Sequence, residues 1–365
     1  MKVPFFDLTQ QYQALKPEVD KAIQGVLDRC EYISGQSVSS FEKNFAHLHR
    51  AKYCVAVSSG TSALHIALWA LGLQTGDEVI VPSHTFIATA AAVSLAGGKP
   101  IFVDSEEKYY NIDPRAIEKA ITKKTRAIIA VHLYGQPAEI DTIAAIAKKH
   151  HLWLIEDCAQ AHGAEYKGVP VGTFGICGCF SFYPSKNLGA FGEGGAVVTQ
   201  DEALYQKMLM LRNHGSSQKY EHPLIGQNYR MHELQGAILD VKLKHLQKWT
   251  EARRKLAESY RHHLKDIPGI QLPAENPHAK HVYHLYVIRT KQREKLMEHL
   301  KKQGIATGIH YPIPCHKQEC FASPLSLPTS EKLAEEVLSL PLFPEMTEEQ
   351  VAYTAQKIKE FAHAQ

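Results

Sequence analysis

The residues best suited to chemistry lie in SFYPSKNLGAFGEGG, residues 181–195, where Lys186 follows Ser181 by five positions. The lysine is followed by four closely spaced glycines: Gly189, Gly192, Gly194 and Gly195. Glycine permits positive φ and lets the backbone approach a ligand closely. A lysine in such a loop can bind phosphate, pair with an acid or act as an amine nucleophile. The ordinary alternative is a solvated lysine in a surface turn.

Three further groups follow predicted strands. The run Gly60-Thr61-Ser62 comes after the strand 53–58 and opens a helix, whose free N–H groups and dipole suit a phosphate. Asp157 ends the apolar strand 152–157, where a lone carboxylate is costly without a cationic partner. Ser181 and Lys186 flank the end of the strand 179–183. Ligands collect at the carboxyl ends of parallel strands, so we expect these groups to lie together.

A phosphate nest, a carboxylate that needs a partner and a loop lysine together match the requirements of pyridoxal phosphate. In that interpretation Lys186 forms the Schiff base and Asp157 keeps the pyridine nitrogen protonated. Backbone N–H groups and hydroxyls then hold the phosphate. Two other nucleotide-binding explanations fail, because the chain has neither G-x-x-x-x-G-K-[ST] nor a G-x-G-x-x-G between an early strand and a helix.

The elements that must position these residues alternate between strands and helices. We expect strands at 53–58, 78–82, 100–104, 126–134, 152–157, 179–183 and 195–199, most of them followed by a helical pattern. This order predicts an α/β fold with a largely parallel sheet covered on both faces. A long helical pattern from Met231 leads to a smaller α+β domain. We expect a large domain at 1–249 and a small domain at 250–365.

Composition narrows the class of protein. The 365 residues hold 41 basic and 38 acidic side chains, a net charge of +3 that favours neither a nucleic-acid nor a membrane partner. The N-terminus lacks an apolar signal region, and the run 85–98 is too short to span a bilayer, so we expect a soluble, cytoplasmic protein.

The seven cysteines are irregularly spaced, which favours reduced thiols over a disulfide framework. One cluster could suggest a metal site: His310, Cys315, His316 and Cys320. The stretch that carries it contains two prolines and no paired C-x-x-C or H-x-x-x-H spacing, so we predict no metal.

Six motifs, taken in order, resemble those of the DegT/StrS-type sugar-nucleotide aminotransferases: SSGTSALHIAL, PSHTFIATAAAV, VHLYGQPAEID, IEDCAQAHGA, SFYPSKNLGAFGEGGAVVT and GQNYRMHELQGAIL. The resemblance covers essentially the whole chain. It implies a fold-type I homodimer that binds pyridoxal 5'-phosphate at the interface of domains and subunits. Cys158 departs from the pattern, since the family commonly has a small residue there, and we interpret it as a packing change.

The resemblance also implies individual roles. Lys186 would be the catalytic Schiff-base lysine, Asp157 would lie at the pyridine nitrogen and Gln160 near the phenolic oxygen. Phe86 would stack on the ring, although a core aromatic is the alternative. The phosphate would be held by Gly60, Thr61, Ser62, Ser181 and, from the partner subunit, Asn228, which could equally be a turn residue. Tyr183, His310 and Tyr311 match positions near the sugar or nucleotide, and Tyr183 could instead fill a strand.

Relatives that dehydrate sugars carry histidine in place of Lys186, so the lysine argues for amino transfer. We therefore expect transfer from L-glutamate to a keto group, at C3, of a dTDP-linked 6-deoxyhexose in deoxyaminosugar biosynthesis. The alternatives are a 4-aminotransferase of UDP- or GDP-sugars and a regulatory protein that keeps the fold without turnover. The intact lysine, aspartate and serine argue against the regulatory alternative.

Overall fold

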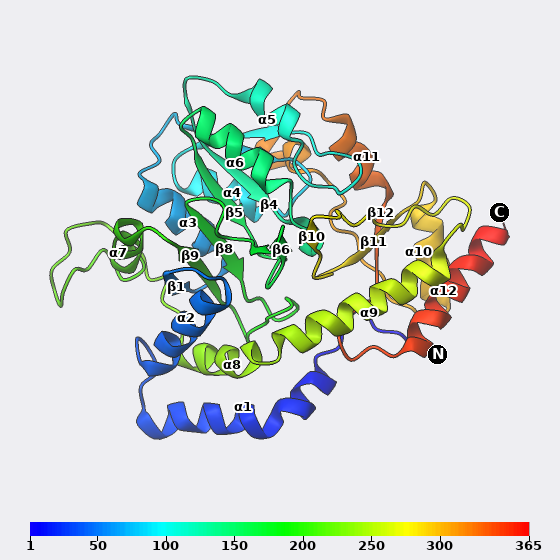
Figure 1. Ribbon diagram of the computed structural model, residues 1–365, viewed down its shortest axis with the longest axis horizontal. Coiled ribbons are helices and arrows are strands. Elements are labelled where there is room, and N and C mark those ends of the chain that lie inside the picture. Colours follow the sequence, from blue (N-terminus) through cyan, green and yellow to red (C-terminus); the bar gives the residue numbers. More distant parts are fainter. Residues whose placement is uncertain (365) are drawn as a thin grey trace.

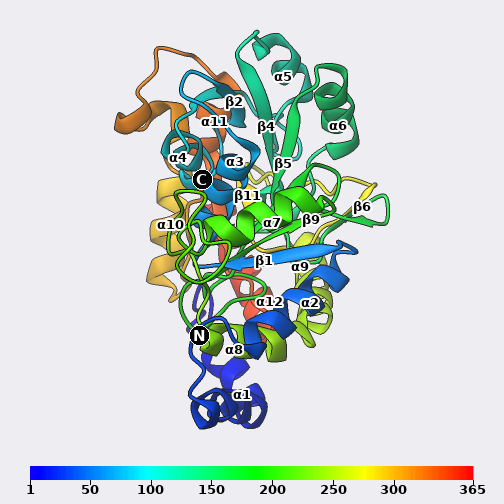
Figure 2. The same ribbon diagram turned by 90° about the vertical axis from the view of Figure 1, so that its left-hand side faces the viewer.

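A seven-stranded sheet forms the centre of the larger part of the molecule in the computed structural model, which describes residues 1–364 (Figures 1 and 2). Across the sheet the strands follow the order β1 (Tyr53–Val57), β9 (Gly195–Thr199), β8 (Cys177–Ser181), β5 (Trp153–Asp157), β4 (Thr125–Val131), β2 (Glu78–Pro82) and β3 (Lys99–Val103). All neighbours pair in parallel except β9, which is antiparallel to both β8 and β1. The predicted α/β class with a mostly parallel sheet is confirmed.

The reversal of β9 has a local cause. Strands β8 and β9 are neighbours joined by the lysine loop without an intervening helix, and a parallel pair needs a long crossover connection. The chain therefore turns back on itself, and the loop 182–194 emerges at the carboxyl end of β8.

Helices cover both faces of this sheet. They are α3 (Gly60–Leu71), α4 (Ala88–Leu95), α5 (Pro114–Ala120), α6 (Ile140–Lys149) and α7 (Glu202–Leu211). Asp113 and Asp201 cap α5 and α7 by accepting hydrogen bonds from Arg115 N and Leu204 N. Val55 and Val81 pack in one buried cluster with α3 and α7, while Ile80 and Ile128 pack in another with α5 and α6. The strands are therefore apolar on both faces, as in other covered parallel sheets.

A second core lies around a two-stranded sheet of β11 (Tyr286–Arg289) and β12 (Val337–Leu340). Its helices are α9 (Leu246–Leu264), α10 (Arg293–Lys302) and α12 (Glu348–His363). Val3 packs in this core and its backbone pairs with Ile305, so the N-terminal segment joins the small domain. The limits 1–249 and 250–365 remain a proposal. Figure 1 shows α9 running from beneath the sheet toward the C-terminal helix.

The long helix expected from Met231 is two helices, α8 (Glu233–Leu243) and α9. Lys244 N and His245 N bond to carbonyls three residues back, at 3.3 and 3.0 Å, and such tighter bonds close a helix. Two helices precede the sheet, α1 (Thr9–Arg29) and α2 (Gln36–Leu48), and α11 (Pro328–Glu336) precedes β12. Short pieces complete the structure: β6 (Glu165–Tyr166), β7 (Val169–Pro170), β10 (Ala279–Lys280) and the 3₁₀ turns Leu133–Gly135, Cys315–Lys317 and Glu319–Phe321.

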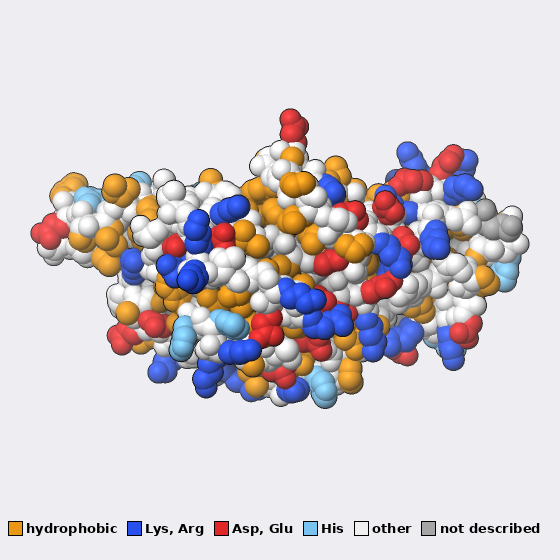
Figure 3. Space-filling view, turned by 90° about the horizontal axis from the view of Figure 1, so that it is seen from above, with side chains coloured by type: hydrophobic (Ala, Val, Ile, Leu, Met, Phe, Trp, Pro, Cys, Tyr) orange, Lys and Arg blue, Asp and Glu red, His pale blue; other side chains and the backbone are white. Residues whose placement is uncertain are grey.

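Within residues 1–364, no helix combines the length and the apolar character that crossing a membrane requires. Figure 3 shows basic and acidic side chains mixed over the face seen from above, in keeping with the nearly balanced charge.

Candidate active site

The carboxyl ends of β1, β5 and β8 meet at one edge of the sheet, because these strands point the same way. Gly60, after β1, lies against Ser181 at the end of β8. A Cβ placed on Gly60 would be 2.5 Å from the Ser181 Cβ, so only glycine fits there. The N–H groups of Gly60 and Thr61 begin α3, where no preceding helical carbonyl can accept them. The structure thus brings together Gly60, Thr61 and Ser181, three of the residues expected to hold a phosphate.

Ser62 already makes hydrogen bonds within the chain, which the sequence did not predict. Its N–H donates to Ser59 Oγ at 3.1 Å, and its hydroxyl lies 3.0 Å from Ser59 O. Ser59 is the N-cap of α3, so Ser62 helps to close the start of this helix. Its role toward a phosphate stays a prediction.

Asp157 ends β5 with 6% of its surface exposed. Its Oδ2 accepts from Thr89 Oγ1 at 2.8 Å and its Oδ1 from Ala159 N at 3.1 Å. Among residues 1–364, no lysine, arginine or histidine nitrogen lies within ion-pair distance of it. Burial raises the pKa of Asp157, while the charge of Lys186 acts in the opposite direction. This carboxylate has acceptor capacity left and lacks a direct cationic partner.

Lys186 lies in a turn in which its N–H donates to Tyr183 O at 2.9 Å. Burial lowers the pKa of Lys186 to about 8, an effect partly offset by the negative charge of Asp157. The side chain is only partly buried, and none of the carboxylates in the described chain forms an ion pair with it. A lysine of this kind is a better nucleophile and base near neutral pH than an ordinary one.

Three buried or partly buried imidazoles lie near enough to Lys186 for its charge to affect their pKa values. The pKa of His162 is lowered to about 3 and that of His310 to about 4, mainly by burial and further by the charge of Lys186. The pKa of His284 is also well below its usual value, for the same two reasons. All three rings are therefore neutral near pH 7, and they add no positive charge next to the amine.

The lysine loop is fixed at two points. Gly189 lies so close to Pro184 that an added Cβ would be 2.2 Å from the Pro184 carbonyl oxygen. The buried Lys242 of α8 donates to Gly189 O. On the other side, Asn187 Nδ2 donates to Val282 O at 3.0 Å, which ties the loop to the segment before β11. Such anchoring holds the amine in a defined place.

Gln160 connects the sheet edge to the segment after α10. Its Oε1 accepts from Tyr134 N at 2.6 Å, and its Nε2 donates to the Tyr311 hydroxyl at 3.0 Å. The ring of Tyr311 lies 5.6 Å from that of Phe86, centroid to centroid. Phe86 is 53% exposed, so the core alternative for this aromatic is wrong, and stacking on a ligand ring stays a prediction.

Two further expected residues, Asn228 and Tyr183, are exposed at the surface. Asn228 is exposed, its Oδ1 accepts from Arg230 Nε at 3.0 Å, and its backbone pairs with Asn213. It follows the loop that projects beside α7 in Figure 1. Tyr183 is 50% exposed, so it does not fill the strand. The roles of both residues remain predictions.

Several residues that contact the site were not expected from the sequence. Thr89 donates to Asp157, and Tyr134 links His84, at 2.8 Å from its hydroxyl, to the backbone of His310. Thr89 could have been suspected, because it is a hydroxyl residue in the alanine-rich helix three positions after Phe86. Neither His84 nor Tyr134 carries a comparable signal.

Behind the site, His132, Glu156 and Cys158 lie close enough to suggest a metal centre. His132 Nε2 lies 3.0 Å from Glu156, and its Nδ1 accepts from Ala138 N at 3.0 Å. Glu156 also accepts three backbone N–H groups, from Gly172, Phe174 and Gly175. Both ring nitrogens and both carboxylate oxygens are therefore in use, and we assign this cluster to structure.

Residues 13–359 match the DegT/DnrJ/EryC1/StrS aminotransferase family. The chain is 48% identical to a pleiotropic regulatory protein of Geobacillus stearothermophilus, with 99% of each chain covered. It is 46% identical to the UDP-N-acetyl-3-dehydro-alpha-D-glucosamine 3-aminotransferase of Acidithiobacillus ferrooxidans, covering 99% of this chain and 98% of the relative.

It is also 45% identical to the dTDP-3-amino-3,4,6-trideoxy-alpha-D-glucose transaminase of Streptomyces venezuelae, covering 99% of this chain and 96% of the relative. A crystal structure of S. venezuelae DesV in complex with a ketimine intermediate superimposes with a TM-score of 0.97 at 45% identity, over 99% of this chain and 98% of that one. The chain therefore belongs to the DegT/DnrJ/EryC1/StrS aminotransferase family. The family, the fold and the class of enzyme expected from the sequence, a sugar aminotransferase, are confirmed.

Proposed function

We propose that the protein uses pyridoxal 5'-phosphate to transfer an amino group from L-glutamate to the C3 keto group of a dTDP-linked 6-deoxyhexose. The observation that carries the proposal is the placement of Lys186, Asp157 and the Gly60–Ser181 contact at one sheet edge. The names of the Acidithiobacillus and Streptomyces relatives support amination at C3, although they differ in the nucleotide.

Three independent observations indicate that these residues could bind pyridoxal 5'-phosphate. Asp157 is a buried carboxylate whose direct partners within residues 1–364 are one hydroxyl and one N–H, which leaves room for a protonated ring nitrogen. Gly60, which opens α3, lies so close to Ser181 that a Cβ is excluded, and the free N–H groups at the start of a helix suit a phosphate. Lys186 offers an amine of lowered pKa. When bound, the cofactor supplies an electron sink that stabilises negative charge at the carbon bearing the amine.

Around that group each residue has one task. Asp157 holds a proton at the pyridine nitrogen through a charge-assisted hydrogen bond worth roughly 1.5–3 kcal/mol. Lys186 accepts the proton from the α-carbon of the donor and later returns one to the sugar carbon, and positioned acid–base catalysis contributes ~10²–10⁴-fold. Gln160, held by Tyr134 N, presents its amide toward the phenolic oxygen. His310 and Tyr311 are proposed to contact the sugar nucleotide.

The test is a panel of dTDP-, UDP- and GDP-linked 3-keto and 4-keto sugars, prepared in situ, with L-glutamate as the donor. Aminated product measured by mass spectrometry should be greatest for a dTDP-linked 3-keto sugar. Preference for a 4-keto sugar on UDP or GDP would instead favour the 4-aminotransferase alternative.

The Geobacillus relative is named a pleiotropic regulatory protein, so a regulatory function is the second candidate. The donor half reaction separates the two, because a regulatory protein need not react with an amino acid. Adding L-glutamate to the purified yellow protein should bleach the cofactor absorbance. An absorbance unchanged by glutamate and by every other amino acid would favour regulation.

We also propose that the protein acts in the cytoplasm as a homodimer in which Asn228 reaches the phosphate of the partner subunit. Exposure of Asn228 supports this assignment. If Lys186 and Asn228 act on one cofactor from different chains, mixing Lys186→Ala with Asn228→Ala yields heterodimers with one intact site.

Co-expression of the two variants should then produce activity that neither homodimer has. The Asn228→Ala parent must be impaired, which loss of one phosphate hydrogen bond, ~1.5–3 kcal/mol, would cause. An impaired parent without rescue would remove Asn228 from the shared site.

A further inference from the structure

A cavity of about 300 Å³ lies where the N-terminal segment, the lysine loop and the small domain meet. Its lining includes Phe5, Phe6, Ser185, Arg253, His284 and His310. Ser185 is the neighbour of Lys186 in the chain, and the two histidines are close enough to Lys186 for its charge to lower the pKa of each. The cavity therefore adjoins the proposed reaction centre.

Arg253, on α9, is a buried cation that forms no ion pair with any residue in the described range 1–364. It is 6% exposed, and its Nη1 donates to the carbonyls of Tyr283, His284 and Leu342 at 3.2, 3.3 and 3.0 Å. Its Nε is buried without a partner, and its hydrogen bonds within residues 1–364 all use Nη1. Burial lowers the pKa of Arg253 to about 10, so the group stays charged at neutral pH. The negative charge of Glu345, which lies beyond ion-pair distance, acts in the opposite direction and raises this pKa.

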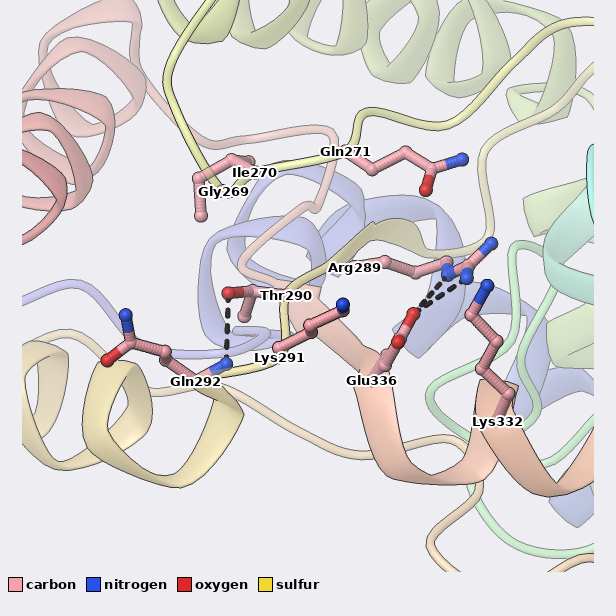
Figure 4. A pocket seen from close by; sticks show the side chains of 9 residues that line it. All are labelled: Gly269, Ile270, Gln271, Arg289, Thr290, Lys291, Gln292, Lys332 and Glu336. Carbon is pink, nitrogen blue, oxygen red and sulfur yellow. Dashed lines mark hydrogen bonds and ion pairs between the residues drawn. The ribbon is translucent and has the colours of Figure 1, made fainter.

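A second buried arginine, Arg289, differs from Arg253 because carboxylates of the chain bind its guanidinium. Arg289 lines a separate cavity of about 460 Å³ (Figure 4). Its Nε and Nη2 donate to Glu336 at 3.0 and 2.6 Å, and Nη2 also donates to Glu107 at 3.0 Å. Carboxylates pair with the guanidinium of Arg289, whereas no carboxylate in residues 1–364 forms an ion pair with that of Arg253.

The lining of the cavity narrows the ligand to one chemical class. Arg253 supplies its only formal charge, because the imidazoles of His284 and His310 are neutral near pH 7. Phe5, Phe6 and Leu342 supply apolar walls. A single desolvated cation beside apolar surface suits a carboxylate on an aliphatic stem. A diphosphate would need more positive charge than this cavity offers.

We propose that this cavity binds the side-chain carboxylate of the amino donor through Arg253 and Ser185, and thereby selects L-glutamate over L-glutamine. The inference rests on the proposed function, since it assigns the donor subsite of that reaction. Glutamine has the same shape but a neutral amide, which cannot replace the charged partner of a guanidinium.

The first test measures binding without turnover. Glutarate carries two carboxylates and no amine, and its binding to the purified holoenzyme is followed by isothermal titration calorimetry. Arg253→Met should weaken glutarate binding about 10- to 100-fold. It should also reduce the ratio of kcat/KM for L-glutamate over L-glutamine toward one. The matched control is Arg254→Gln, since Arg254 pairs with Glu275 on the same helix and lines no part of the cavity.

Because Arg253 also bonds three carbonyls, Arg253→Met could fail to fold, and a second pair of variants avoids this. Ser185→Asp places a carboxylate in the cavity while Arg253 stays in place, and Ser185→Asn adds the same volume without charge. Ser185→Asp should bind glutarate at least about tenfold more weakly than Ser185→Asn, because the new carboxylate competes for the guanidinium.

Equal affinities in that pair, or unchanged glutarate affinity in a folded Arg253→Met, would overturn the donor subsite. A wild-type enzyme that transfers its amino group equally well from glutamine and glutamate would overturn it too, and would leave the aminotransferase function intact. Conversely, a wild type that binds glutarate through Arg253 but transfers no amino group would refute the proposed function alone.

Discussion

Glu156 and Asp157 are adjacent on β5 and point to opposite faces of the same sheet, yet the fold treats them differently. Glu156 is fully buried and receives His132 Nε2 together with the N–H groups of Gly172, Phe174 and Gly175. Asp157 is almost as buried but receives only Thr89 Oγ1 and Ala159 N. The first carboxylate is satisfied within the chain, while the second is left with spare acceptor capacity.

The difference distinguishes a structural charge from a functional one. A buried carboxylate is costly unless hydrogen bonds or a cation compensate it. At Glu156 the loop 172–175 and His132 supply that compensation, so removing the charge should damage the fold. At Asp157 compensation is incomplete until a ligand binds, so removing the charge should spare the fold and damage the activity. The same contrast exists between two buried cations. Carboxylates pair with the guanidinium of Arg289, whereas none in residues 1–364 forms an ion pair with that of Arg253.

The largest effect is expected at the amine that faces Asp157. Lys186→Arg keeps a positive charge but cannot bond covalently to an aldehyde at neutral pH, and it cannot shuttle protons. We expect the yellow colour of the protein to disappear and turnover to fall to background, by more than about 10³-fold. The absorbance spectrum and a product assay measure both. A variant with near-normal turnover would refute the mechanism.

Asp157→Asn should be the next most damaging substitution for activity. A neutral amide cannot hold the ring nitrogen protonated, so kcat should fall roughly 10- to 100-fold. The effect on stability has the opposite sign. Because the pKa of Asp157 is raised in the folded state, its contribution to stability is present at low pH and is lost as the pH rises. At pH 7 we therefore expect the unliganded variant to be at least as stable as the wild type in urea. Unchanged kinetics would make Asp157 merely structural.

Glu156→Gln is the matched test on the other face. The amide would turn its NH₂ group toward His132 Nε2 or the backbone donors, which leaves buried donors unpaired. We expect a loss of about 3 kcal/mol in the free energy of unfolding, measured as a lower urea midpoint with an unchanged m-value. Enzyme that remains folded should keep most of its kcat. If Glu156→Gln reduced kcat as strongly as Asp157→Asn and left stability intact, the contrast between the two acids would be wrong.

The smallest expected effect is a pH dependence that links Asp157 to Lys186. Only the neutral amine attacks the aldehyde of pyridoxal phosphate, so the rate of cofactor uptake by stripped protein should rise with pH and level off above about 8. The charge of Asp157 raises the pKa of Lys186, so Asp157→Asn should shift this midpoint to lower pH. Stopped-flow absorbance follows the uptake. A midpoint unmoved by the substitution would mean that the two groups do not interact.

Much of the fold and the centre of the site could be predicted from the sequence, because both depend on local patterns. Continuous apolar runs predicted the strands, and a polar residue just after such a run predicted the positions of Asp157 and Ser181 at one sheet edge. The reversal of β9 was not expected, although the absence of a helix between β8 and β9 explains it. The break between α8 and α9 was also missed, because the apolar spacing continues across Lys244 and His245.

The sequence by itself determined which residues can react: an amine in a glycine-rich loop, a carboxylate after an apolar strand, and small residues that open a helix. Only the tertiary structure decided which charges are compensated. The sequence places Asp157 at the end of the strand, but it does not show that Glu156 is compensated and Asp157 is not, and it does not distinguish Arg253 from Arg289 in this respect. Their difference depends on donors and carboxylates from distant segments, such as Phe174, Thr89 and Glu336, that come within hydrogen-bond distance only after folding. Because a hydrogen bond forms only when donor and acceptor lie within about 3.5 Å of each other, the compensation of a buried charge is set by three-dimensional contacts.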